Sequence, residues 1–197
     1  MEPAGKPEVK RHGDTMNQKE FYTQLWKTEY TPSQCAEPLA RYIAKTANKD
    51  DLLLDIGCGD GTTVHKLRAA GFKAYGVDLT LAGVKEASPF FYEMPITKMD
   101  LFLDSAFDYT FSTDCLEHLP EEEVGPAIAE ILRITKRQTF HCIPIIGDTR
   151  LGIDVHLSKH EPDWWSRRFA QANLKGISVT IKEREAFLQE MNHANKN

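Results

Sequence analysis

The sequence predicts a doubly wound α/β fold, in which helices cover both faces of a mostly parallel sheet. A short apolar run at residues 52–56 has the length of a buried strand, and the glycine-rich turn GCGDG and a helical pattern follow it. Further β-forming segments alternate with helical patterns up to about residue 144, and this order is typical of parallel sheets. A chain of 197 residues with 41% hydrophobic residues is large enough for one domain with its own core.

The residues before the first strand divide into an arm and a cap. Residues 1–15 hold proline, glycine and charges without apolar periodicity, so we expect a flexible arm. Residues 16–197 are expected to form a single domain, in which residues 16–48 are a helical cap. The cap is dense in aromatic side chains, which serve either as plain packing or as a lid over an acceptor pocket. For the lid, the candidate substrate-binding residues are Tyr22, Trp26 and Tyr30.

The turn after the first strand has glycine at every second position, at Gly57, Gly59 and Gly61. Glycine permits positive φ and lets a ligand lie against bare backbone. A dinucleotide site expects the spacing G-x-G-x-x-G, with a pyrophosphate at the helix N-terminus. Here the pattern is D-x-G-x-G-x-G, and the carboxylate of Asp55 would oppose a pyrophosphate but suits a ligand with an ammonium group. The spacing therefore disfavours a nicotinamide oxidoreductase.

A second strand is predicted at residues 73–77, and Asp78 stands at its carboxyl end. In doubly wound folds, an acid at this place, roughly 20 residues after the turn begins, binds a ribose diol. A carboxylate can accept hydrogen bonds from both hydroxyls. The structural alternative for Asp78 is the N-cap of a helix over LTLAGVKEA. Together with the glycine turn, the ribose role is the better interpretation.

The remaining core elements follow in order. We expect a helix over LTLAGVKEA and then a weak third strand within residues 92–98. Residues 107–112 alternate and predict the fourth strand. The apolar spacing of VGPAIAEILRITK predicts a helix that faces the sheet, and residues 138–144 predict the fifth strand.

Two motifs of the chain are similar to those of a known family. The heptapeptide DIGCGDG closely resembles the first motif of class I S-adenosylmethionine-dependent methyltransferases, and Leu116-Glu117-His118 matches the LEH tripeptide that often follows their fourth strand. The resemblance covers about residues 50 to 145 and implies a Rossmann-like methyltransferase fold with S-adenosyl-L-methionine as cofactor. It also implies a polar residue after the third strand that reaches the adenine, which places Asp100 and Leu101 there. The residues expected at the cofactor are Asp55, Gly57, Cys58, Gly59, Gly61, Asp78, Leu79, Asp100, Leu101 and Thr113.

The last quarter of the chain begins with an irregular stretch, followed by a helix that Glu161 and Pro162 open. Trp164 and Trp165 are adjacent, so they cannot both face the core from one helix. We expect one of them to pack and Trp164 to contact the substrate. Segments 176–182 and 186–189 predict two closing strands, the last one antiparallel, which would complete a seven-stranded sheet.

Methyl transfer from a sulfonium requires donor and acceptor to be held in contact and in line. If the acceptor is a hydroxyl or a protonated amine, a base removes its proton. His156, in the loop after the fifth strand, is the first candidate, and His118 of the LEH motif is the second. His156 and His160 are four residues apart, but no carboxylate or cysteine completes a metal set beside them, so no metal is expected.

The net charge, the apolar runs and the cysteines indicate the class of partner and the cellular compartment. The net charge is −5 without a long basic run, which argues against a methylase that grips nucleic acid by its phosphates. No run approaches the roughly 18 apolar residues of a membrane helix, and no signal peptide is recognisable. The scattered cysteines predict reduced thiols in a cytoplasmic protein; they are Cys35, Cys58, Cys115 and Cys142.

Two motifs that the chain lacks restrict the class of methyl acceptor. Amino-methylating nucleic-acid enzymes carry an Asn/Asp-Pro-Pro-Tyr/Phe tetrad where this chain has Asp114-Cys115-Leu116-Glu117, and there is no Pro-Cys nucleophile. The main hypothesis is therefore O- or N-methylation of a small or medium-sized acceptor. A methyltransferase of RNA or protein and a catalytically silent cofactor-binding scaffold stay open, as do the acceptor's identity and the oligomeric state.

Overall fold

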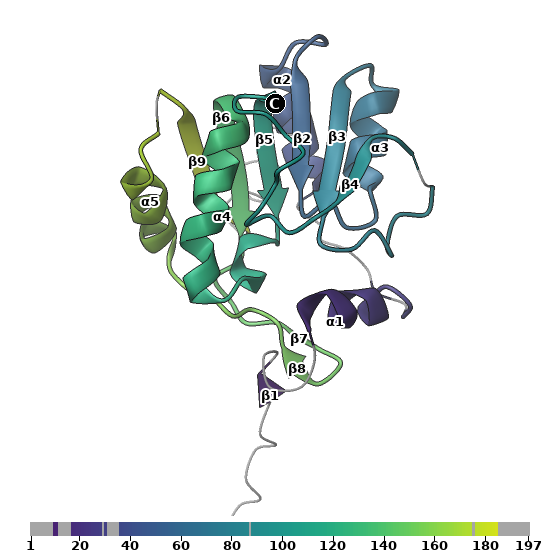
Figure 1. Ribbon diagram of the computed structural model, residues 1–197, viewed down its shortest axis with the longest axis vertical. Helices are drawn as coiled ribbons and strands as arrows, with labels where there is room; N and C mark the ends of the chain where they lie inside the picture. The colour runs from purple at the N-terminus through teal and green to yellow at the C-terminus, as the bar shows by residue number, and fades with distance from the viewer. Residues whose placement is uncertain are drawn as a thin grey trace, which may run out of the picture.

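The computed structural model describes residues 10–11, 17–28, 30, 36–86, 88–174 and 176–184. In these residues the main sheet has six strands, all parallel, in the order β4-β3-β2-β5-β6-β9 (Figure 1). The order reverses between β2 and β5, and doubly wound folds bind ligands beside such a point. The strands are β2 (Leu52–Ile56), β3 (Lys73–Asp78), β4 (Phe91–Glu93), β5 (Phe107–Thr113), β6 (Thr135–Ile143) and β9 (Ser178–Glu183).

Helices cover both faces of this sheet, as the sequence predicts (Figure 1). Leu53 and Leu54 of β2 point to opposite faces because side chains alternate along a strand, and both are fully buried. Leu54 belongs to the core under α4 and α5, whereas Leu53 belongs to the core under α2 and α3. The helices are α1 (Gln18–Leu25), α2 (Ala36–Thr46), α3 (Thr62–Ala69), α4 (Glu121–Ile134) and α5 (Pro162–Gln171), with a 3-10 turn η2 (Leu116–His118).

A second, smaller sheet lies below the carboxyl edge of the main sheet, next to α1 (Figure 1). Its strands are β1 (Lys10–Arg11), β8 (Ile153–Asp154) and β7 (Thr149–Arg150), of which β7 and β8 form a hairpin. Phe21 and Leu25 of α1 pack on Val155, directly after β8, and all three side chains are buried. This contact holds α1 beside the carboxyl ends of the main strands.

The structure corrects the expected helix at LTLAGVKEA. Its described residues form turns instead, with Gly83 packed against the indole of Trp26 and the Leu81 N–H donating to the Glu93 carboxylate at 2.9 Å. A Cβ at residue 83 would lie 2.5 Å from Trp26 Cδ2, so the segment is shaped by α1 rather than by its own periodicity. Asp78 therefore caps no helix.

Two predicted strands also differ. The third strand, β4, ends at Glu93, because Pro95 follows and proline cannot donate to a sheet ladder. The first closing strand is found as β9, which pairs directly and in parallel with β6. The predicted antiparallel strand at residues 186–189 lies outside the described residues, and so does most of the arm at residues 1–15.

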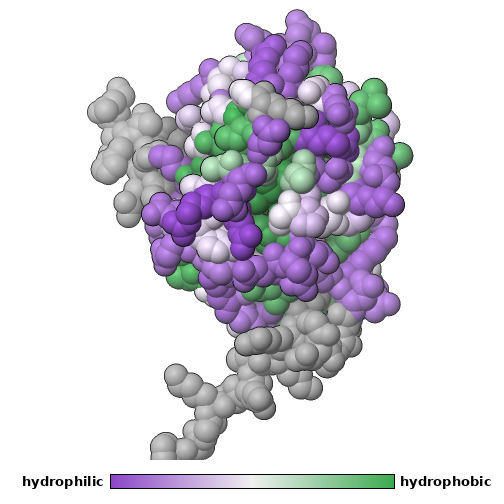
Figure 2. Space-filling model, turned by 60° about the vertical axis from the view of Figure 1, so that its left-hand side comes forward, coloured by the Kyte–Doolittle hydropathy of each residue, from purple (hydrophilic) through white to green (hydrophobic). Residues whose placement is uncertain are grey.

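The cysteines and the helices of the described residues can be compared with what the sequence predicts for thiols and membrane spans. Cys58, Cys115 and Cys142 are free, and Cys35 lies outside the described residues. None of the described helices combines the length and the apolar composition needed to cross a bilayer. On the side of α5 and β9, hydrophilic residues surround a smaller hydrophobic area (Figure 2).

Candidate cofactor and acceptor site

A cavity of about 430 Å³ lies at the carboxyl ends of β2, β3 and β5, and residues of α1 form one of its walls. Four segments line it: the glycine turn after β2, the end of β3, the loop after β4 and the residues that follow β5. Of the residues expected at the cofactor, seven line it: Asp55, Gly57, Cys58, Gly59, Asp78, Leu79 and Thr113.

The glycine turn passes from β2 into α3 with its backbone against the cavity. Gly57 and Gly61 have φ angles of 72° and 76°, in the left-handed region that favours glycine. A Cβ at Gly57 would lie 2.5 Å from Cys115 Sγ, and one at Gly61 would lie 2.6 Å from Phe91 Cζ. Gly61 is therefore needed for packing behind the turn and does not itself line the cavity.

Two carboxyl groups lie beside this turn, the buried Asp55 and the half-buried Asp78. Asp78 accepts hydrogen bonds from the backbone N–H of Gly59 at 2.9 Å and of Thr80 at 3.3 Å. Burial raises the pKa of Asp78 to about 6, although these hydrogen bonds oppose the shift. Burial also raises the pKa of Asp55 well above its usual range, and the charges of Asp78 and Asp60 add to that shift. The pair favours a ligand that brings hydroxyl donors or a positive charge.

The residues expected beside the adenine, Asp100 and Leu101, lie away from the cavity, and earlier residues of the loop after β4 line it instead. Leu101 is 72% exposed, and the exposed Asp100 carboxylate pairs with Lys98 Nζ at 3.4 Å. Neither lines the cavity, so the structure does not bring them to the candidate cofactor site. Because β4 ends at Glu93, the loop meets the cavity earlier in the sequence, through Pro95, Ile96 and Thr97. The proline was the signal that could have identified them.

The aromatic residues before the first strand form a wall of the cavity, which we call the aromatic wall: Tyr22, Trp26 and Tyr30. Trp26 lies against Gly59 and Gly83, and its ring meets that of Tyr30 edge-on at 4.9 Å between centroids. Gln18 also lines the cavity, and its Nε2 donates to the carbonyl of His118 at 3.2 Å. Sequence analysis missed Gln18 because nothing distinguishes it from other polar residues of a helix.

Trp164 does not line the cavity, contrary to expectation. Its ring stacks on His160 with centroids 3.7 Å apart, while Trp165 is fully buried in the core under α5. His160 Nε2 lies 3.4 Å from a carboxylate oxygen of Glu121 at the start of α4. The stack therefore joins α4 and α5.

Of the two candidate bases, only His118 lines the cavity. His118 Nδ1 lies 2.9 Å from Tyr22 Oη and 2.9 Å from the carbonyl oxygen of Val155. His156 is buried behind it, and its Nδ1 lies 2.6 Å from the carbonyl oxygen of Ile146. The geometry therefore does not place His156 where it could deprotonate an acceptor in the cavity.

Glu117, whose carboxylate lies near both histidines, is fully buried. Burial raises the pKa of Glu117 well above its usual range, and the charge of Asp114 adds to the shift. The sequence could not pair Glu117 with His156, because Glu117 lies in η2 and His156 in the loop after β8.

Comparisons with known proteins agree with this arrangement. Residues 54–143 match the family model described as a methyltransferase domain. The "Probable methyltransferase ltbC" of Aspergillus luteorubrus is 28% identical over 186 residues, which cover 83% of this chain and 62% of that protein. The "Uncharacterized methyltransferase C1B3.06c" of Schizosaccharomyces pombe is 24% identical, covering 80% and 59%. The chain thus spans about three fifths of the length of these curated relatives.

A solved structure with the same fold is the 1,6-didemethyltoxoflavin-N1-methyltransferase of Burkholderia thailandensis, with bound 1,6-didemethyltoxoflavin and S-adenosylhomocysteine. It is 16% identical, covers 78% of this chain and 75% of its own, and has a TM-score of 0.59. At this identity the likeness concerns the fold. The matched domain, the shared fold and the glycine turn at the reversal of strand order make this chain similar to the class I S-adenosylmethionine-dependent methyltransferases.

Proposed function

We propose that the chain binds S-adenosylmethionine in the cavity and transfers its methyl group to an oxygen or nitrogen atom of a small or medium-sized acceptor. The observation that carries this proposal is the meeting of Asp55, Asp78 and the glycine turn in one cavity of about 430 Å³. That volume is within the range of roughly 300–1,000 Å³ found for small-ligand sites.

The residues present fit the cofactor. Asp78 would accept hydrogen bonds from the ribose hydroxyls, and the bare backbone at Gly57 and Gly59 would lie under the amino-acid part. Buried Asp55 adds negative charge near the ammonium group, and Ile96 offers an apolar contact to the adenine. When bound, the cofactor supplies a methyl group on a sulfonium, which leaves as a neutral thioether.

The aromatic wall would hold the acceptor and exclude water. Tyr22 and Trp26 line the cavity, Trp26 next to Gly59 of the glycine turn, and aromatic faces also attract a cation. His118 is not assigned as a free base, because its Nδ1 faces Tyr22 and Val155 and its Nε2 lies 3.6 Å from Glu117. The chain's main task would be to hold donor and acceptor in line.

A small acceptor is supported by the volume of the cavity and by the small molecule bound to the Burkholderia structure of the same fold. The formal charge of −5 supports the same choice over nucleic acid.

The test is calorimetric titration with S-adenosylhomocysteine, and NAD serves as the control ligand. We expect binding of the thioether alone, and we expect Asp78→Asn to weaken it by about tenfold or more, the equivalent of about 1.4 kcal/mol. Asp100→Asn is the matched control, because Asp100 is an exposed acid outside the cavity and its loss should leave affinity unchanged.

Transfer of a labelled methyl group to a panel of small hydroxyl and amine compounds would then identify the acceptor. Binding of NAD instead of the thioether would refute the cofactor assignment. Cofactor binding with transfer only to RNA or protein would refute the small acceptor.

A further inference from the structure

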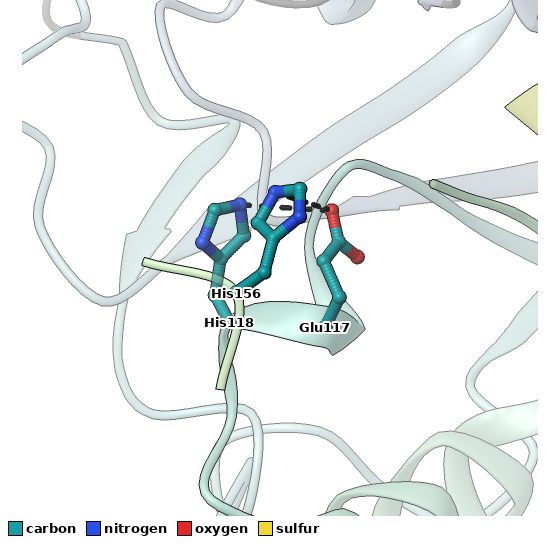
Figure 3. A group of neighbouring side chains, drawn as sticks. All are labelled: Glu117, His118 and His156. Carbon is teal, nitrogen blue, oxygen red and sulfur yellow. Dashed lines mark ion pairs between the residues drawn. The ribbon is translucent and has the colours of Figure 1, made fainter. Parts of the chain in front are cut away.

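The side chains of Glu117, His118 and His156 converge on one another (Figure 3), and His118 also lines the cavity. Glu117 and His118 belong to η2, and His156 comes from the loop after β8. One ligand atom from each side chain lies within 4.8 Å of the other two. We call these residues the Glu-His-His cluster.

The carboxylate of Glu117 has no side-chain hydrogen-bond partner in the described part of the chain, and the charge of Arg184 offsets only part of the effect of burial. The side chain is fully buried, and neither oxygen has a hydrogen-bond partner there. Its Oε1 lies 3.6 Å from His118 Nε2 and 3.8 Å from His156 Nε2, which is too long for hydrogen bonds. An ionised carboxylate in such a place is costly unless a cation compensates it.

Both imidazole rings present a lone pair to this carboxylate. His156 Nδ1 lies 2.6 Å from the carbonyl oxygen of Ile146, and His118 Nδ1 lies 2.9 Å from that of Val155. A carbonyl oxygen only accepts, so Nδ1 carries the hydrogen in each ring and Nε2 of the neutral ring is left as an acceptor. Metal-binding histidines are held in this way, with the other ring nitrogen donating to a carbonyl or carboxylate.

We propose that the Glu-His-His cluster binds one divalent first-row transition-metal ion, with Zn²⁺ as the representative. Two nitrogen ligands and one oxygen ligand suit such ions, whereas Mg²⁺ and Ca²⁺ prefer oxygen ligands alone. Ligands about 2.1 Å from a tetrahedral ion lie about 3.4 Å apart. The observed separations of 3.6 and 3.8 Å are close to that value.

The two segments that supply the ligands are already fastened together. Ser158 N–H donates to the carbonyl of Glu117 at 3.0 Å, and Ser158 Oγ donates to the carbonyl of Leu119 at 2.7 Å. The ion would therefore enter a prearranged site, and it would fix His118 in the wall of the cavity. This site does not depend on the proposed methyl transfer.

The experiment uses the full, untagged chain after dialysis against a chelator. Zn²⁺ is titrated against a competing chromophoric chelator, and bound zinc is counted by elemental analysis. We expect about one ion per chain, and we expect Glu117→Gln to weaken binding by at least about 100-fold because a neutral amide is a poor ligand. Co²⁺ should give visible absorption bands that are lost in the same variant.

His160→Gln is the matched control. His160 lies four residues after His156 but contacts Trp164 and Glu121, so its loss should leave zinc affinity unchanged. A second variant, His156→Gln, should behave as Glu117→Gln does, and circular dichroism reports whether each variant is folded. The proposal is overturned if the wild type binds no zinc, if folded Glu117→Gln binds it as tightly, or if His160→Gln alone loses it.

Discussion

At the scale of single residues, the carboxyl edge of the sheet is distinguished by buried acids. Asp55 and Glu117 are buried there and Asp78 is half-buried, and desolvation raises the pKa of each. Asp78 is the best compensated, because Gly59 and Thr80 donate to its two oxygens. The local chemistry therefore favours ligands that donate hydrogen bonds or carry positive charge.

The raised pKa of Asp78 predicts how cofactor affinity depends on pH. Burial raises this pKa from 3.8 to about 6 in the ligand-free protein, so the carboxyl is mostly neutral below pH 6. If ribose hydroxyls donate to the ionised form, the dissociation constant of S-adenosylhomocysteine should increase by up to about tenfold for each pH unit below 6. Calorimetry between pH 5 and about pH 8 measures this.

The matched variant for this prediction is Asp78→Asn, which cannot titrate. Its weaker binding should lack the step near pH 6 that the wild type shows. The same shift should affect the stability of the ligand-free protein. The pKa of Asp78 is higher in the folded than in the unfolded state, so the folded state binds the proton more tightly. The free energy of unfolding should therefore decrease as pH increases from 3.8 to about 6. Identical pH profiles for the two proteins would contradict the role of Asp78.

At the scale of elements, α1 and the glycine turns depend on each other. Trp26, which ends α1, rests on Gly83 and Gly59, and a Cβ at residue 83 would lie 2.5 Å from its ring. The absence of a side chain at Gly83 is therefore what lets the aromatic wall approach the turn. The wall's position is set by this packing together with Phe21 and Val155.

Gly83→Ala should displace the Trp26 ring and weaken the binding of S-adenosylhomocysteine by roughly tenfold, the loss of one well-packed contact of about 1.4 kcal/mol. Calorimetry measures the affinity, and the tryptophan emission spectrum reports the ring. Gly125→Ala is the control, since a Cβ there meets nothing within 4 Å; in the interior of α4 it should stabilise the fold by about 0.5–1 kcal/mol. Unchanged affinity in folded Gly83→Ala would separate Trp26 from the cofactor.

The elements also explain how far the sequence could predict this structure. Strands β2, β3, β5 and β6 and helix α4 were predictable, because their apolar periodicity matches the burial that the fold imposes. LTLAGVKEA has helical periodicity but is held in turns by Trp26, a contact distant in sequence. The hairpin of β7 and β8 has two-residue strands, too short to show a period.

The same reasoning applies to the site. Asp55 and Asp78 lie at the carboxyl ends of β2 and β3, and the glycine turn follows β2 directly, so strand order alone brings them together at one edge. The Glu-His-His cluster needs a contact between η2 and the loop after β8, which no spacing encodes. The sequence paired His156 with His160, but the structure pairs it with Glu117 and His118.

At the scale of the whole molecule, the parallel sheet separates two cores. Ile131 of α4 belongs to the core on one face and Ile43 of α2 to the core on the other, and both are fully buried. Residues of β2 contribute to both cores, so the sheet is the only structure that the two cores share in the described residues. Each core should therefore contribute to stability largely on its own.

This separation predicts additive effects on stability. Ile131→Ala and Ile43→Ala should each lower the free energy of unfolding by about 2–5 kcal/mol, because each leaves a cavity in a fully buried place. The double variant should lose the sum within about 0.5 kcal/mol, since the side chains lie on opposite faces of the sheet. Urea unfolding of the four proteins, followed by far-ultraviolet circular dichroism, measures the cycle.

Ile131→Ala with Leu54→Ala is the comparison pair, because both side chains belong to one core and their effects should depart from additivity. A coupling between Ile131 and Ile43 as large as that of the comparison pair would mean that the sheet transmits changes in packing between its faces.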